Sequence, residues 1–293
     1  MSPALIEKDY WVTEALRVVA ASHAEGVVFK GGTSLSKAWG LIKRFSEDLD
    51  LLIRQDETTG GTAGSRDRYM KEIAASVGEL DGLESATDGA RSERGVSRTS
   101  VFTYESRTAV LEGLRQTVIL EMGIRGGAHP TEDRSLRSLV STAIEPGKVE
   151  DETLKPFDMA VLHPQRTVVE KLFAIHSACE LWHEGRTGAI QRQGRHLYDI
   201  HFLLGDDAVA AFVGGVEYLA LVGEIDGFGR QYFPCDHRTP DCMRLASSRA
   251  LAPGEELRKA IEDDYVRSRF LFADEQPSLD AVYARIAEFR DRL

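Results

Sequence analysis

The sequence has few cysteines and no long apolar run. Its three cysteines are too few and too unevenly spaced for a disulfide framework, so we expect reduced thiols and a cytosolic protein. No stretch of about 18 apolar residues occurs, and charge follows soon after Met1, which argues against a membrane-spanning helix or a secretory signal. Basic residues are outnumbered 36 to 47, and the net charge of −11 disfavours a general duplex-binding protein while allowing a local basic groove.

The chain does contain ample material for a core, since 42% of its 293 residues are hydrophobic. This length suggests two domains of ordinary size, or one domain with a helical extension. The apolar patterns predict mixed strands and helices up to residue 160 and mostly helices from 161 onward. Residues 84–98 are polar, contain glycine and show no periodicity, so they are predicted to form a loop.

Two carboxylates stand two residues apart in the segment SEDLDLLI, residues 46–53. On a strand, Asp48 and Asp50 would share one face about 6.6 Å apart, while Leu49 and Leu51 would point into a core. Like charges this close are costly unless a cation lies between them, and Mg²⁺ is a hard cation that prefers oxygen ligands. The alternative is a solvated strand end with two surface acids, and so short a motif fits both interpretations.

A glycine pair precedes this segment in the sequence. Gly31 and Gly32 follow an apolar strand and precede a predicted helix, where backbone N–H groups can bind phosphates. A plain tight turn would explain the glycines alone, but a glycine turn followed by DLD on a second strand is more specific. It predicts a phosphate site and a metal site on neighbouring strand ends. The same segment offers further phosphate ligands: Lys30, Thr33, Ser34 and Lys37.

These motifs resemble those of a known family. The pattern hGG[ST]…DhDh is that of polymerase-β-like nucleotidyltransferases. The longer string FKGGTSLSK…RFSEDLDL is similar to the AbiEii/AbiGii-type branch, the nucleotidyltransferase toxins of toxin–antitoxin and phage-defence systems that include the mycobacterial MenT toxins. The strings IEKDYWV, RTVVEKLFAIH and RHLYDI also resemble motifs of that branch. The resemblance covers nearly the whole chain, with gaps around 55–115 and 205–250.

The resemblance implies a bilobed α+β fold. A nucleotidyltransferase core with a small mixed sheet would occupy residues 1–160, and a helical domain closing the active-site cleft would occupy 161–293. The implied reaction transfers a nucleotide from a nucleoside triphosphate to an acceptor hydroxyl, with Mg²⁺ held by Asp48 and Asp50. The resemblance further implies that the acceptor is the 3′ end of tRNA, that translation is blocked, and that a cognate antitoxin exists.

Two later residues are ionisable groups in apolar helical surroundings. Lys171 has small and apolar helical neighbours, so it either reaches solvent or faces a cleft that holds an anion. Asp199 lies in the apolar stretch HLYDIHFLL and needs a partner, for which Arg195 and Lys171 are candidates, in a structural ion pair or in a site. The resemblance places Lys171 on the triphosphate. It makes Asp199 a residue that orients Lys171 or helps to deprotonate the acceptor hydroxyl.

Three further residues received specific predictions. Glu121, a lone acid in TVILEMGI, matches the third metal carboxylate common in this superfamily, or else lies on the outer face of an edge strand.

Ser46 would share the face of Asp48, and in some relatives an antitoxin kinase phosphorylates a serine in this region. A phosphate there would add about −1.5 to −2 charge beside the metal site and block it. Glu170 is predicted to cap its own helix through a capping box with Thr167.

Other functions stay open at this point. The chain could transfer nucleotides to a small molecule or a protein, or act as a non-catalytic nucleotide-binding partner. No short motif reports which nucleotide or tRNA is used, the oligomeric state or the antitoxin type. Arginine clusters fit either solvated loops or a groove for an RNA end; they are Arg91, Arg94 and Arg98, then Arg107 and Arg115, then Arg186, Arg192 and Arg195.

Overall fold

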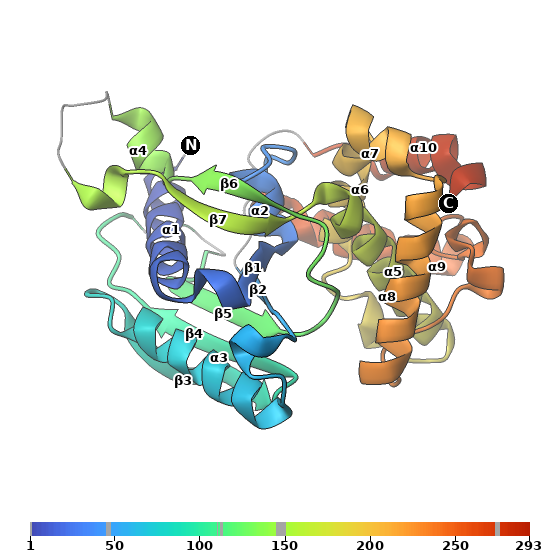
Figure 1. The fold of residues 1–293 in the computed structure, drawn as a ribbon. Helices are drawn as coiled ribbons and strands as arrows, with labels where there is room; N and C mark the ends of the chain where they lie inside the picture. Colours follow the sequence, from blue (N-terminus) through green and yellow to red (C-terminus); the bar gives the residue numbers. More distant parts are fainter. Residues whose placement is uncertain (1, 45–47, 110, 112–113, 145–150, 273–275) are drawn as a thin grey trace. The chain divides into compact units, whose positions relative to one another are not determined.

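The computed structural model describes residues 2–44, 48–109, 111, 114–144, 151–272 and 276–293 (Figure 1). The chain forms two compact units, of which the first comprises 1–40 with 45–162 and the second 41–44 with 163–293. A sheet with covering helices makes up the first unit, and the second is built from helices and loops. None of the helices in the described ranges combines the length and apolar character needed to cross a membrane.

The strands of the first unit form a seven-stranded mixed sheet in the order β3-β4-β5-β2-β1-β7-β6. β2 runs parallel to β5 and β1 runs parallel to β7, whereas the other neighbouring pairs are antiparallel. The strands are β1 (Val27–Lys30), β2 (Asp48–Ile53), β3 (Glu84–Glu93), β4 (Ser97–Thr103), β5 (Thr117–Gly123), β6 (Thr131–Leu136) and β7 (Phe157–Leu162).

Helices α1 (Pro3–His23) and α3 (Ala63–Gly78) pack on one face of this sheet. That face is apolar because side chains alternate along each strand, so Leu49 and Leu51 of β2 are buried beside apolar residues of β5. Burying a leucine side chain stabilises the fold by about 1.5–3 kcal/mol. The opposite face of β2 therefore carries the intervening Asp48 and Asp50, and the apolar face fixes their strand in place. The shorter helices of this unit are α2 (Gly31–Lys37) and α4 (Leu139–Ala143).

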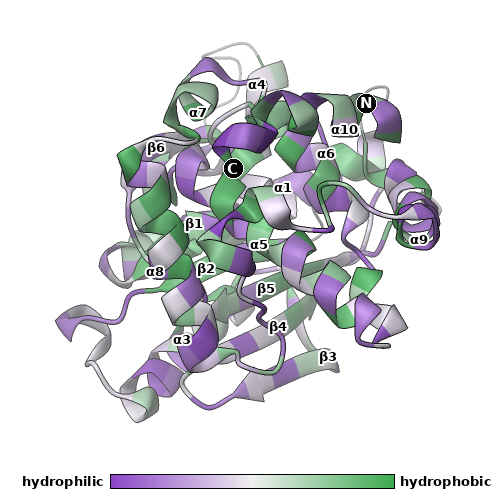
Figure 2. Cartoon of the chain, turned by 90° about the vertical axis from the view of Figure 1, so that its right-hand side faces the viewer, coloured by the Kyte–Doolittle hydropathy of each residue, from purple (hydrophilic) through white to green (hydrophobic). Residues whose placement is uncertain are grey.

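The predicted loop at 84–98 was wrong, because these residues form β3 and the start of β4. β3 is the edge strand of the sheet, and nearly all of its residues are exposed. Figure 2 shows its hydrophilic colouring. A strand that buries neither face carries no alternation of apolar and polar residues, so no period-two pattern marks this strand in the sequence.

The second unit contains the longest helices after α1. Helix α5 begins at Pro164, and His163 is its N-cap, four residues before Thr167, the N-cap of the predicted capping box. Glu170 therefore lies inside the helix, where its carboxylate accepts a hydrogen bond from Arg166 one turn back. The helices are α5 (Pro164–His183), α6 (Gly194–Leu203), α7 (Asp207–Phe212), α8 (Val216–Tyr232), α9 (Glu255–Arg267) and α10 (Leu279–Phe289).

Candidate active site

The glycine turn, which consists of Gly31 and Gly32 in the first turn of α2, lies directly against Asp50. Gly31 adopts φ +76°, a left-handed conformation that favours glycine. A Cβ atom built on Gly31 would lie 1.9 Å from Oδ2 of Asp50, so no other residue fits while this carboxylate keeps its position. Lys30 and Asp50 are also register partners across the β1–β2 pair. The structure therefore brings the glycine turn and one predicted metal carboxylate into contact.

Asp48 is held at the start of β2 by the same turn. The hydroxyl of Thr33 donates a 2.7 Å hydrogen bond to the backbone carbonyl of Asp48, which joins α2 to β2. The hydroxyl of Ser34 donates to the carbonyl of Gly31 at 2.9 Å. Thr33 and Ser34 are both buried, so their hydroxyls serve the turn itself. A phosphate at this turn would therefore be bound by backbone N–H groups rather than by these hydroxyls.

The two predicted phosphate-binding lysines have protein partners. Lys37 forms a 2.6 Å ion pair with Asp9 of α1, and its side chain is only 6% exposed. Lys30 donates to the carbonyl of Arg125 at 2.8 Å. Asp9 also accepts a 2.6 Å hydrogen bond from the backbone N–H of Leu139. The structure thus gives Lys37 a structural contact that the sequence reasoning missed.

Asp9 belongs to a run of three charged residues in α1 that hold separate loops. Glu7 accepts hydrogen bonds from the hydroxyls of Ser106 and Thr108 at 2.6 and 2.7 Å. Lys8, which is fully buried, donates to the carbonyl of Arg115 at 3.1 Å. The local pattern of EKD indicates only a charged turn of helix. The resemblance of this string to a family motif was the one signal that pointed to a specific role for the three residues.

Glu121 lies beside Asp50 on the same face of the sheet. The two residues are register partners in the parallel β2–β5 pair, so their side chains point to the same side. Oε1 of Glu121 also lies 3.6 Å from Nη2 of Arg91 on β3. Within the described ranges, no group of three His, Cys, Asp or Glu side chains is placed to hold a metal ion. Glu121 is therefore near the pair without completing a three-residue site.

Asp48 and Asp50 nevertheless fit a Mg²⁺ site of the kind that substrates complete. Mg²⁺ is commonly bound through one or two carboxylates, with phosphate oxygens and water supplying the other ligands. Both donors are hard oxygen ligands fixed on a central strand, and Asp48 is only 3% exposed. The glycine turn contacts Asp50, so a phosphate bound at this turn would lie next to the carboxylate and could supply further oxygen ligands to the ion. Ser46, the predicted phosphorylation site, lies outside the described residues.

The second unit contains a buried cluster of charges around Asp199. Nε and Nη2 of Arg44 donate to the two carboxylate oxygens of Asp199 at 2.6 and 2.7 Å. Nζ of Lys171 on α5 lies 2.6 Å from Oδ2 of the same carboxylate on α6. Lys171 is also 3.4 Å from Nδ1 of His196. The structure confirms Lys171 as a partner of Asp199 and adds Arg44, which lies 155 residues away in sequence.

Burial and charge determine the ionisation of this cluster. Burial alone would raise the pKa of Asp199, but Arg44 and Lys171 lower it below its usual 3.8. Burial lowers the pKa of Lys171, and the Asp199 carboxylate offsets part of that shift. Burial, followed by the charges of Lys171 and Arg195, holds the pKa of His196 well below 6.5. Asp199 is therefore an ion-pair partner and a weak base.

Comparison with known proteins adds two matches. The family model described as nucleotidyl transferase AbiEii toxin, type IV toxin–antitoxin system, matches residues 14–285. Among solved structures, the chain is similar to MenT4, a nucleotidyltransferase toxin from Mycobacterium tuberculosis H37Rv, with 19% identity and a TM-score of 0.58. That match covers 99% of this chain and 83% of the other, and it confirms the predicted α+β fold. No curated protein sequence matches the chain.

Proposed function

Because the chain belongs to the AbiEii nucleotidyltransferase toxin family of type IV toxin–antitoxin systems, we propose that it transfers a nucleotide from a nucleoside triphosphate to the 3′ end of tRNA and thereby blocks translation. The observation that carries this proposal is the contact between the glycine turn and Asp50, since a Cβ at Gly31 would overlap the carboxylate. A phosphate-binding turn and metal-binding acids are two of the recurring parts of phosphoryl-transfer sites.

In the proposed reaction, the acceptor hydroxyl attacks the α-phosphate and loses its proton to solvent, the bond between the α-phosphate and the bridging oxygen breaks, and pyrophosphate leaves. Asp48 and Asp50 would hold Mg²⁺, which would supply charge neutralisation at the phosphates. Backbone N–H groups from Gly32 to Ser34 contact the phosphates. Glu121 is the candidate for a further metal contact.

Residues of the second unit receive roles that follow from their charges. The family resemblance assigns Lys171 to the negative charge of the departing pyrophosphate. Asp199 orients Lys171, because its lowered pKa makes it a weak base and its oxygens are already bound by Arg44 and Lys171. Of the two roles that the sequence left open for Asp199, we therefore propose positioning rather than deprotonation.

The direct test is incubation of the purified protein with Mg²⁺, total RNA and each of the four α-labelled nucleoside triphosphates in turn. The expected result is label in the tRNA fraction, removable by a 3′ exonuclease, with one nucleotide preferred. Label in protein or in a small molecule would instead support a transferase with another acceptor. Binding of triphosphate without any transfer would support the non-catalytic alternative and overturn the proposal.

The glycine turn gives a prediction with a matched control. Gly31→Ala is expected to lower nucleotidyl transfer about a hundredfold, because displacing a reacting group by about 1 Å can cost that much. Gly40→Ala is the control, since Gly40 also has a positive φ, +65°, but a Cβ there meets nothing within 4 Å. Both variants carry backbone strain of roughly 1–2 kcal/mol, and Gly31→Ala must also displace the Asp50 side chain, so its thermal unfolding should shift at least as far as that of Gly40→Ala. Equal activity in the two variants would contradict the proposed contact.

A further inference from the structure

Five polar side chains form one row across the open face of the sheet. Each is the register partner of the next across adjacent strands, so all five point to the face opposite α1 and α3. The row contains the two predicted metal-binding acids Asp50 and Glu121 and ends on both sides in a basic residue. In strand order its members are Lys30, Asp50, Glu121, Thr99 and Arg91.

A β-bulge places Arg91 in this row. The β3–β4 register shifts between Ala86 and Arg91, so that Arg91 pairs with Thr99. An uninterrupted ladder continuing from Ala86 would instead put Asp88 opposite Thr99. The bulge therefore replaces an acid by a base beside Glu121, and bulges near active sites commonly redirect a side chain in this way.

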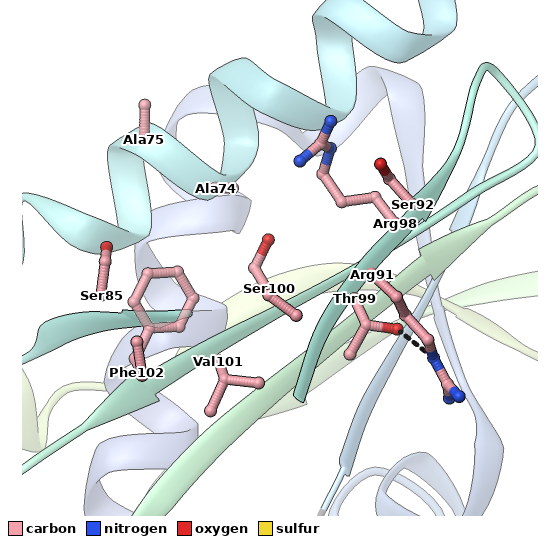
Figure 3. A pocket seen from close by; sticks show the side chains of 12 residues that line it. Ala74, Ala75, Ser85, Arg91, Ser92, Arg98, Thr99, Ser100, Val101 and Phe102 are labelled. Carbon is pink, nitrogen blue, oxygen red and sulfur yellow. Dashed lines mark hydrogen bonds between the residues drawn. The ribbon is translucent and has the colours of Figure 1, made fainter. Parts of the chain in front are cut away.

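Arg91 and Arg98 of the same hairpin point to opposite sides. Figure 3 shows Arg98 directed toward α3 and Arg91 directed away from it, with its hydrogen bond to Thr99 drawn. Both arginines are among the residues that line a cavity of about 380 Å³ at this hairpin, but only Arg98 has an ion pair with α3, through Asp67. The side chain of Arg98 is 19% exposed, whereas that of Arg91 is 75% exposed. Only Arg91 of the two can meet a ligand on the carboxylate face.

The proposed reaction predicts which end of the row lies near the pyrophosphate and which lies near the acceptor. This step rests on the proposed function. The glycine turn lies on the β1 side of Asp50, so the phosphates that leave as pyrophosphate lie on that side. In phosphoryl transfer the attacking and leaving oxygens are roughly in line. The acceptor hydroxyl must then approach from the other side of Asp50, over β5, β4 and β3.

We propose that Arg91 binds a backbone phosphate of a nucleic-acid acceptor strand behind its reacting 3′ end. Arg91 lies three strand spacings, about 14 Å, from Asp50. A small acceptor does not extend that far, but a polynucleotide carries a phosphate at every step. The ion pair with Glu121 at 3.6 Å and the hydrogen bond to Thr99 at 3.3 Å hold the guanidinium over this path.

The test compares Arg91→Met with Arg98→Met and Arg91→Lys in steady-state transfer to total tRNA. Arg91→Met is expected to raise KM for tRNA about tenfold, with KM for the triphosphate unchanged and kcat within about twofold, because a phosphate contact positions without reacting. The slope of log KM against log salt should fall by about 0.7, the value for one single-strand phosphate. Arg91→Lys should restore most of the affinity, and Arg98→Met should resemble the wild type.

The outcomes separate this inference from the proposed function. If the wild-type protein labels no nucleic acid, the proposed function fails before any variant is made. If it labels tRNA and Arg91→Met has the same KM and salt slope as the wild type, the function stands and the assignment of Arg91 is overturned. A change in kcat with KM for tRNA unaltered would also overturn it, because Arg91 would then act only through Glu121.

Discussion

Asp50→Asn is expected to lower kcat for nucleotidyl transfer by about 10³-fold, which corresponds to about 4 kcal/mol of transition-state stabilisation. The substitution keeps the size of the side chain and its place against Gly31 but removes the negative charge that binds the cation. Asp48→Asn should have a similar effect, because the two carboxylates share one face of β2. The measurement is single-turnover transfer of labelled nucleotide at saturating triphosphate.

Asp133→Asn is the matched control for this prediction. Asp133 also lies on a strand of the same sheet, β6, but it is exposed and its register partner is Ala160. This variant should keep wild-type activity, and all three variants should unfold at similar temperatures. Full activity in Asp50→Asn would show that the open face of β2 does not contain the reaction centre.

Asp199→Asn is expected to destabilise the protein by about 3–5 kcal/mol, the usual cost of removing one partner from a buried ion pair. Asp199 is fully buried, and the substitution leaves the cationic Arg44 and Lys171 without their shared carboxylate. Asp207→Asn, at an exposed position at the start of α7, is the control and should be close to the wild type. Urea unfolding at neutral pH measures the difference.

The pH dependence of this difference provides a second readout. The pKa of Asp199 is lowered in the folded protein, so its stabilising contribution is complete above the ordinary value of 3.8. As the pH falls below that value toward the folded-state pKa, the contribution is lost. The gap between the wild type and Asp199→Asn should therefore narrow as the pH falls below 3.8. A gap that stays unchanged in acid until the protein unfolds would contradict the assignment to this carboxylate.

Local patterns in the sequence predicted the parts of the site that one strand or one turn determines. The placement of Asp48 and Asp50 on one face follows from the period of two in a strand whose alternate residues are leucines. The glycine pair was predicted to form a turn between an apolar strand and a helix, and the structure places both glycines directly after β1, in the first turn of α2. The α+β fold and the family were also accessible, because the motifs extend over most of the chain.

Contacts between distant segments could not be read from the sequence. Nothing near Arg44 indicates that it binds Asp199, and Arg195, a nearer candidate in sequence, suggested a different pair. Lys37 was predicted to bind phosphate, and no acid lies near it in the sequence; its partner, Asp9, comes from another helix. The bulge in β3 depends on its pairing with β4, and an edge strand exposed on both faces carries no periodic pattern.

The charge cluster of Asp199 also constrains how such a protein can evolve. If Arg44 is replaced first, Asp199 keeps Lys171 as a partner, so the intermediate retains one compensated pair. If the aspartate is replaced first, two buried cations repel each other until a second mutation replaces one of them. We therefore expect natural substitutions to begin at the arginine and to reach the aspartate last.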